Sequence, residues 1–388
     1  MLPLVLAMLL VAFGSLEASG GEFTIVPSLS VREAYNSNFF LTIDAPESAF
    51  VTTLSPALVV TGRTERLDAS VQARLDNVLY AGISSRDTLD QYYDGQFRYR
   101  PTERLSLSAA ASHSLNSQPD RNLETTGTVD KAGKRSTQTY TIAGESSLSE
   151  KNSVTLSYAY SKIDDQNQRL SDYDTHTAVF ALNHELGSDA ARTRVTAQFQ
   201  YDTDRYAIST VDNYALTIGS NRSFNELWSL QVTLGGRYTQ SEVSVAATRK
   251  TNRDWGGTGR VALSYTADST SGNLTASSDF QPSTSNGVSG ATQRTGLLAG
   301  IRENFTPDLS GNMSLSYILN RSIWEGRNFS PIDEDTLSFN TGLRYEFTKD
   351  MALDATYQYT RIMYNNTGQV ADRNLISLNF LIRYPMFL

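Results

Sequence analysis

A short polar turn recurs along this chain at an almost fixed interval. Each turn follows an aromatic or apolar residue that closes one stretch of alternating residues, and a second alternating stretch begins after it. From residue 148 to residue 347 the steps between the closing residues are 38, 38, 41, 40 and 42 positions. The closing residues are Leu148, Leu186, Phe224, Tyr265, Phe305 and Phe347.

Between the turns, apolar and polar residues alternate. In residues 66–80, Leu67, Val71 and Leu75 fall on one face of a strand, whereas Arg74 and Asp76 fall on the other. A period of two is typical of strands with one apolar and one polar face. Counting such stretches from residue 22 to the end gives about eighteen strands. Each repeat is therefore predicted to be two strands, one short turn and one longer connection.

The connections alternate in length. The short turns lie near residues 62–65, 101–104, 149–152, 225–228, 306–310 and 348–350. The longer polar connections lie at residues 116–135, 164–172, 245–255 and 320–335. A soluble sandwich or propeller would have compact turns on both sides. Short turns at one end and long loops at the other are typical of an outer-membrane barrel, whose short turns face the periplasm.

The predicted fold is therefore all-β: a transmembrane, antiparallel, up-and-down β-barrel of about eighteen strands with both termini in the periplasm. An even number of strands lets the last strand close on the first, as lipid requires. We expect residues 21–388 to form this barrel as one domain, without room for a plug or a periplasmic module. Aromatic residues before the short turns are predicted to form a girdle at the periplasmic membrane interface. They are Tyr99, Phe224, Tyr265, Phe305 and Phe347.

The first twenty residues and the composition indicate export. The apolar run at residues 2–14 and the small residues that follow it match a secretory signal peptide over residues 1–20, although a basic start is missing. The alternative is an ordinary buried helix. The net charge of −8 argues against nucleic acid as a partner, and the chain contains no cysteine.

The first hairpin, residues 31–60, resembles the putative β-barrel porin-2 family. The matching positions are Tyr35, Asn36, Asn38, Ser48, Phe50, Val51, Ser55, Pro56 and Leu58. Ser37 stands where an acidic residue is usual, and Ala57 replaces a glycine. The family is often linked to exopolysaccharide biosynthesis and export loci. The resemblance implies an outer-membrane pore for a polymer or for solutes.

Alternation assigns a set of charged residues to the polar face, which would line the lumen. They are Arg74, Arg98, Arg100, Arg194, Arg237, Arg260, Arg302, Arg344, Arg383, Asp68, Asp76, Asp94, Asp202, Glu346 and Asp354. Arginine makes planar contacts to carboxylates and phosphates, so a basic lumen would suit a carbohydrate that carries negative charge. The alternative is that these charges pair with one another and stiffen the wall. Tyr80 and Tyr364, on the same face, could stack on sugar rings.

Enzyme and metal chemistry are poorly supported. His113 and His184 fall on the apolar face and His176 lies near a loop, so none is placed beside a lumen serine. A zinc site is not expected, since there is no cysteine and no cluster of histidines and acids at ligand spacing. The glycines of residues 254–260 lack the lysine and serine of a phosphate loop. Acidic runs in the long loops are more often solvated than calcium-binding.

The function predicted first is a conduit for exopolysaccharide export in the outer membrane of a Gram-negative cell; the alternative is a general or substrate-selective diffusion porin. A barrel hydrolase and a receptor acting through its loops are further alternatives. No cofactor and no metal are expected. The expected partners are outer-membrane lipid and lipopolysaccharide, a polysaccharide or small hydrophilic solutes, the barrel-assembly machinery and periplasmic export proteins, but no nucleic acid.

Overall fold

The computed structural model describes residues 21–82, 84–118, 134–165, 172–187, 193–206, 209–245, 248–285, 288–322 and 333–387. The predicted signal peptide lies outside these residues. The first nine strands are β1 (Glu22–Asn36), β2 (Ala49–Arg63), β3 (Leu67–Tyr80), β4 (Thr88–Thr102), β5 (Leu105–Asn116), β6 (Arg135–Ser147), β7 (Asn152–Asp165), β8 (Tyr173–Leu186) and β9 (Thr193–Tyr206). The others are β10 (Ser209–Ser223), β11 (Trp228–Val245), β12 (Thr248–Thr266), β13 (Thr270–Ser285), β14 (Val288–Asn304), β15 (Leu309–Ser322), β16 (Asp333–Thr348), β17 (Met351–Tyr364), β18 (Gln369–Arg383) and the two-residue β19 (Met386–Phe387). One short 3-10 helix, η1 (Ser84–Arg86), lies between β3 and β4.

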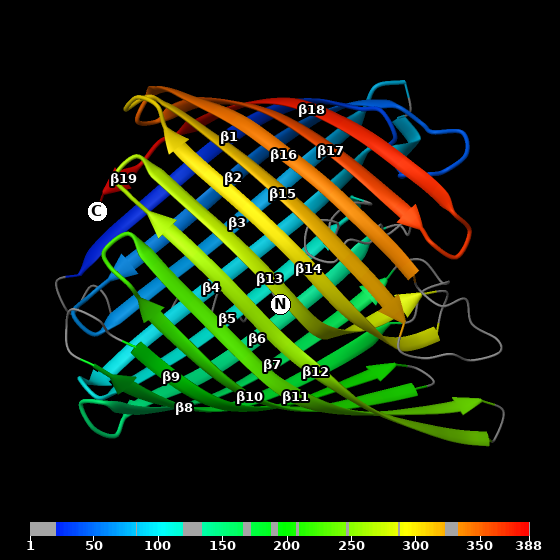
Figure 1. Cartoon of the computed structure of the whole chain (residues 1–388). Coiled ribbons are helices and arrows are strands. Elements are labelled where there is room, and N and C mark those ends of the chain that lie inside the picture. Colours follow the sequence, from blue (N-terminus) through cyan, green and yellow to red (C-terminus); the bar gives the residue numbers. More distant parts are fainter. Residues whose placement is uncertain are drawn as a thin grey trace.

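The strands form one closed, antiparallel sheet. Each strand from β1 to β18 pairs with the next along the chain, and β18 pairs with β1 in a register that sets Arg383 opposite Ser28. After Pro385, β19 continues this seam against β1. Figure 1 shows the tilted strands running around the barrel. The predicted eighteen-stranded barrel is confirmed, and closure leaves no sheet edge in lipid at the junction of first and last strands. No helix in the described part of the chain is long and apolar enough to cross a membrane.

The two ends of the barrel differ. At the short-turn end, where β1 begins and β18 ends, consecutive strands are joined by tight turns such as residues 64–66, 103–104 and 349–350. At the loop end, strands are joined by longer segments such as residues 37–48, which we call the first loop. Most of the predicted long connections at 116–135, 164–172 and 320–335 lie outside the described residues.

One predicted loop is wrong. Residues 245–255 were expected to be a long connection, but β11 extends to Val245 and β12 begins at Thr248, and the described residues of this hairpin are paired as far as Val245 and Thr248. The stretch is polar on both faces, and its alternation was therefore hard to recognise. A hairpin that continues past the membrane has water on both sides and needs no apolar face. This hairpin is seen at the lower right of Figure 1.

The seam between β12 and β13 is the shortest in the barrel wall. Its register comprises eight residue pairs, from Gly259 opposite Ser278 to Thr266 opposite Ser271. The neighbouring seams continue much further, since β11 and β12 pair as far as Val245 and Thr248. Among the described residues, the loop-end parts of β12 and β13 therefore pair with their outer neighbours but not with each other.

Candidate functional site

The outer and inner faces of the wall are assigned by alternation and exposure. In β10, Leu216 and Ile218 are 63% and 65% exposed, which is expected of residues that face lipid. Ala215 and Thr217, which alternate with them, line a cavity inside the barrel. Because directly opposed residues share a face, the strand registers carry this assignment around the wall.

The registers place all fifteen of the predicted lumen residues on the inner face. On β3, the outer face is marked by the exposed Leu79, and the opposite face carries Asp68, Arg74 and Asp76. The registers place the candidates on the other strands on this same inner face. Their contact with a permeating solute stays a prediction.

Several of these arginines are held by carboxylates of the inner face. Arg100 contacts Asp68 at 2.9 Å, and Arg344 contacts Glu346 at 3.0 Å and Asp354 at 3.3 Å. Further pairs of this kind are Arg74–Asp76 and Arg194–Glu185. For these residues the alternative interpretation, a stiffened wall, therefore has direct support. Arg260 differs, since it is exposed to the lumen and forms no ion pair or hydrogen bond with a described residue.

An inner cavity of about 580 Å³ lies against strands β8 to β14 and brings several of the predicted residues together. We call it the chamber. Asp202 and Asp204 of β9 line one side of it, and Arg237, Arg260 and Arg294 line the other, where Asp279 of β13 lies among the arginines. Hydroxyl and amide groups fill the space between them. Those that line the chamber include Thr175, Thr177, Gln198, Gln200, Asn213 and Thr258.

The acidic side is fixed by hydrogen bonds from the neighbouring strand. Thr177 donates through its Oγ1 to an oxygen of Asp202 at 2.7 Å, and Thr175 donates to Asp204 at 2.6 Å. The side-chain amide of Gln200 also donates to Asp202. Asp204 is almost completely buried. Carboxylates positioned in this way keep their orientation without an arginine partner, so they present fixed oxygen acceptors to the chamber.

The basic side is centred on Arg237, whose side chain is only 3% exposed. Its Nη1 donates to the Oγ1 of Thr239 at 2.7 Å, its Nη2 donates to Oε1 of Gln293 at 2.9 Å, and its guanidinium lies 4.7 Å from the ring centre of Phe280. A Cβ at Gly256 would lie 2.6 Å from Nη2 of Arg237. Gly256 is therefore what allows the guanidinium to lie against β12.

An apolar cluster narrows the barrel on the loop side of the chamber. Phe280 of β13 packs against Tyr206 of β9 and Val211 of β10, with Tyr173 of β8 beside them. This contact joins β13 to strands that are three and four places away in the wall. Alternation did not predict it. Phe280 stays in register with Gln293 of β14, and period two would place it on the outer face together with Ala276, yet its ring packs inside the barrel.

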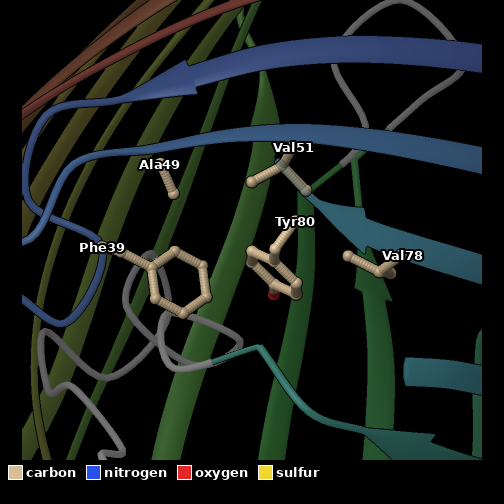
Figure 2. Packing of buried hydrophobic residues seen from close by; sticks show 5 residues of the cluster. All are labelled: Phe39, Ala49, Val51, Val78 and Tyr80. Carbon is tan, nitrogen blue, oxygen red and sulfur yellow. The ribbon is translucent and has the colours of Figure 1, made fainter. Parts of the chain in front are cut away.

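The first loop folds against the inner face of the wall. Phe39 packs on Val51, Val78 and Tyr80, as Figure 2 shows. Leu41, which is fully buried, packs on the other side against β17 and β18, where its neighbours include Tyr364. The loop therefore covers the inner side of the β18–β1–β2 junction. Apolar residues inside a predicted loop were the signal that could have revealed this.

Tyr80 and Tyr364 are not available for stacking on sugars in the way the sequence suggested. Tyr80 is buried beneath Phe39, with ring centres 5.2 Å apart, and Tyr364 packs beside Leu41. Both were correctly placed on the inner face. Their covering could not be predicted, since it depends on a loop whose path the alternation does not describe.

The predicted girdle residues all lie at the short-turn end. Phe224, Phe305 and Phe347 are about half exposed, and Tyr265 packs against Trp228 with the two rings tilted by 48°. Their role at the membrane interface stays a prediction.

A second aromatic band on the outer face, nearer the loops, was missed. In it Tyr201, Tyr214, Tyr238 and Trp255 follow one another across four strands with ring centres 5.0, 6.2 and 4.8 Å apart. Tyr214 lies ten positions from Phe224, which at the usual rise and tilt of barrel strands corresponds to about 25 Å, the height of a lipid-facing band.

Residues 258–384 match a known family model. Its description is Putative beta-barrel porin 2. The match confirms the family predicted from the first hairpin, although the motif at residues 31–60 lies outside the matched segment. The segment covers about a third of the chain, from the paired part of β12 to the end of β18, so it includes Arg260 and Arg294. No curated protein matches this chain.

Two solved structures show the same fold. The ferric citrate transporter FecA, in its unliganded form, has a TM-score of 0.53 and 7% identity, over 94% of this chain and 79% of that one. The siderophore receptor PiuA from Acinetobacter baumannii has a TM-score of 0.50 and 10% identity, over 92% and 82% of the two chains. These likenesses show the fold. The family match over residues 258–384, with the closed barrel, supports an outer-membrane, porin-like channel. The short-turn end is periplasmic and the loop end extracellular.

Proposed function

We propose that this barrel is a substrate-selective diffusion channel for small hydrophilic solutes, and that the chamber is its selectivity site. One observation carries the proposal: the fixed carboxylates of Asp202 and Asp204 face the guanidinium groups of Arg237, Arg260 and Arg294 across a cavity of about 580 Å³. Cavities of about 300–1,000 Å³ are typical of small-molecule sites. Opposed charges orient dipolar solutes and select among ions in a pore.

The chemistry of the lining favours solutes that are rich in hydroxyl groups. Threonine, glutamine and asparagine side chains both donate and accept hydrogen bonds, as sugar hydroxyls do. Arg260 has no ion-pair partner among the described residues, so it is available to an acidic group on the solute. Sugars and sugar acids therefore fit the chamber better than apolar molecules or large cations.

Two features restrict the passage. The cluster of Phe280, Tyr206 and Val211 projects on the extracellular side of the chamber, and the first loop covers the opposite inner wall. A channel of eighteen strands is otherwise wide enough for an aqueous pore. Narrowing by protein groups is what gives a wide barrel selectivity by size as well as by charge.

Ion selectivity in planar bilayers tests this function. The variant Asp202→Asn removes one negative charge and keeps the shape, and we expect it to shift the permeability ratio of K⁺ to Cl⁻ toward chloride by about fivefold, the equivalent of about 1 kcal/mol. Arg260→Gln should shift the ratio in the opposite direction. Asp308→Asn, in a short turn, is the matched control and should change nothing. A ratio insensitive to both chamber variants would overturn the chamber as selectivity site.

Exopolysaccharide export remains the second candidate, and a specific arrangement favours it. Two further polar cavities line the inner wall nearer the periplasm, one of about 550 Å³ at Arg63, Asp68 and Arg98, and one of about 470 Å³ at Arg344 and Asp354. Successive sites along a pore suit a chain that advances by repeating units. We expect block by acidic oligosaccharides to strengthen with each added sugar if the barrel conducts a polymer. Block that stops strengthening beyond a disaccharide favours the diffusion channel.

We also propose that residues 1–20 are a signal peptide and that the barrel-assembly machinery inserts the mature chain. The apolar run and the small residues near position 20 support cleavage close to Ala18–Gly21. Mass spectrometry of the protein extracted from outer membranes tests this. A mature chain that begins within this interval supports cleavage, whereas an intact Met1 in the membrane-inserted protein would exclude it.

A further inference from the structure

The short seam between β12 and β13 separates two cavities of opposite character. On the inner side lies the chamber. On the outer, lipid-facing side lies a groove of about 380 Å³, which we call the seam groove; it is lined by apolar residues that include Leu234, Val261, Ala276 and Leu297. Gly259, Arg260 and Ser277 line both. These three residues are therefore the partition between the lumen and the lipid.

The partition lies within the membrane. On β12, Gly259 is six positions from Tyr265, which at the usual rise and tilt places it about 15 Å from the periplasmic interface. Trp255, on the outer face of the same strand, marks the other interface ten positions from Tyr265, and it is 77% exposed. The paired part of the seam thus ends inside the outer leaflet, where backbone groups without partners are unfavourable.

Side chains, rather than a backbone ladder, bridge the seam beyond Gly259. Thr258 of β12 donates to Asp279 of β13 at 3.3 Å. Arg237 reaches Gln293 of β14, whose amide donates in turn to Ser278 at 2.8 Å. Two of these side-chain hydrogen bonds, Thr258 to Asp279 and Arg237 to Gln293, cross the seam. They can exchange with water or ligand one at a time, whereas a continuous ladder separates cooperatively. The seam is therefore built to open at this point.

The two cavities together describe one kind of ligand. A hydrocarbon chain fits the seam groove, since its walls are the apolar outer faces of β11 to β14. A negative head group fits the chamber side, where Arg260 lines both cavities and makes no ion pair with any residue that the structure describes. A neutral or cationic head group would gain nothing from this arginine, so the charge selects an anionic amphiphile.

We propose that the β12–β13 seam is a lateral portal, through which an amphiphile with a hydrocarbon chain and an anionic head group passes between the chamber and the outer leaflet. This route is separate from the axial path of the proposed channel. It does not depend on which hydrophilic solute the channel conducts.

Photolabelling in nanodiscs tests the portal. The probe is dodecyl phosphate with a diazirine next to the phosphate, and labelled peptides are identified by mass spectrometry. We expect labels on chamber residues of β11 to β14. The chain has no cysteine, so the pair Thr258→Cys and Asp279→Cys can be joined across the seam by oxidation. Chamber labelling should then be lost, while labelling of the seam groove remains, and a reductant should restore it.

A second cysteine pair is the matched control. Ser338 and Thr360 face each other on the inner wall of the intact β16–β17 seam, with their hydroxyl oxygens 3.5 Å apart. Joining them should leave chamber labelling unchanged. Equal chamber labelling with the β12–β13 seam closed would show entry through the mouths and would overturn the proposal, as would labels confined to the outer face. Heat-dependent gel mobility verifies that each variant is a folded barrel, and no conductance is needed for the readout.

Discussion

The side-chain amide of Asn38 donates a hydrogen bond to the backbone carbonyl oxygen of Asp372 at 3.1 Å, and so joins residues 334 positions apart across the junction of β18 and β1. The same amide donates to the carbonyl oxygen of Thr42, whose backbone N–H donates back to the Asn38 side chain. Asn38 is 3% exposed. It therefore holds the first loop and the barrel closure together.

Replacing Asn38 with alanine should destabilise the closure. The change removes the side-chain hydrogen bonds to the half-buried backbone of Thr42 and to the carbonyl oxygen of Asp372, which costs about 1–3 kcal/mol of unfolding free energy. The temperature at which the barrel loses its compact gel mobility measures this. Asn273→Ala, at an exposed site without a hydrogen bond to a described residue, is the control and should change stability by less than about 0.5 kcal/mol. Equal midpoints for the two variants would contradict the role of Asn38.

Gly256→Ala should displace the guanidinium of Arg237. The added Cβ would lie 2.6 Å from Nη2, so the side chain must give up its contact with Gln293 or Phe280. We expect a loss of about 1–3 kcal/mol in stability. Gly257→Ala is a matched control one residue away, since nothing lies within 4 Å of its Cβ position. A variant at Gly256 as stable as the one at Gly257 would show that Arg237 adapts without cost.

Phe347→Ala should weaken the barrel at its periplasmic end. Phe347 makes edge contacts with Tyr345 at 5.0 Å and with Phe380 at 6.4 Å, and such pairs contribute about 0.5–1.5 kcal/mol beyond the area they bury. Phe347→Tyr keeps the ring and adds a hydroxyl suited to the interface, so it should restore the stability. Failure of tyrosine to restore it would argue that the position is part of an apolar core and not of a girdle.

Hydrogen exchange should distinguish the two parts of β12. In residues 260–266 the amides pair with β11 on one side and with β13 on the other, so all should be protected. In residues 252–258 only the side of the strand that faces β11 is paired. The amides of an antiparallel strand point to its two neighbours in turn, so about half of these amides, those that point toward β13, should exchange faster. Uniform protection along β12 would mean that the seam is closed in the membrane.

The alternation of apolar and polar residues predicted those features that depend only on one strand and its neighbour, such as the face of the wall on which a side chain lies. The inner position of Arg74 or Arg344 follows from period two alone, because a closed register cannot shift without moving every side chain to the other face. The position of Phe39 could not be predicted in this way, since it belongs to a loop that turns back over the wall. Phe280 was not predicted either: it stays paired with β14 but has lost its pairing with β12, and its ring turns to the inner side against the alternation of its strand.

The chamber was predicted only in its parts. Asp202, Arg237 and Arg260 were each assigned to the lumen, but alternation carries no information on how the side chains of β9, β11 and β12 meet inside a barrel. Asp204 and Arg294 were not singled out, although they share the inner face with Asp202 and Arg302. The missing side chain at Gly256 was the signal for a buried guanidinium nearby, whereas from the sequence this glycine was weighed only as part of a phosphate loop.

The row of aromatic rings from Tyr201 to Trp255 gives the outer surface of the barrel an intrinsic fluorescence signal. Light absorbed by a tyrosine in this row passes to the indole at its end, because the ring centres are at most 6.2 Å apart. Trp255 sits on the hairpin that borders the seam, so its emission reports the angle between that hairpin and the rest of the wall. Energy transfer along this row therefore offers an intrinsic fluorescence signal for the proposed lateral portal, and following it requires no added dye.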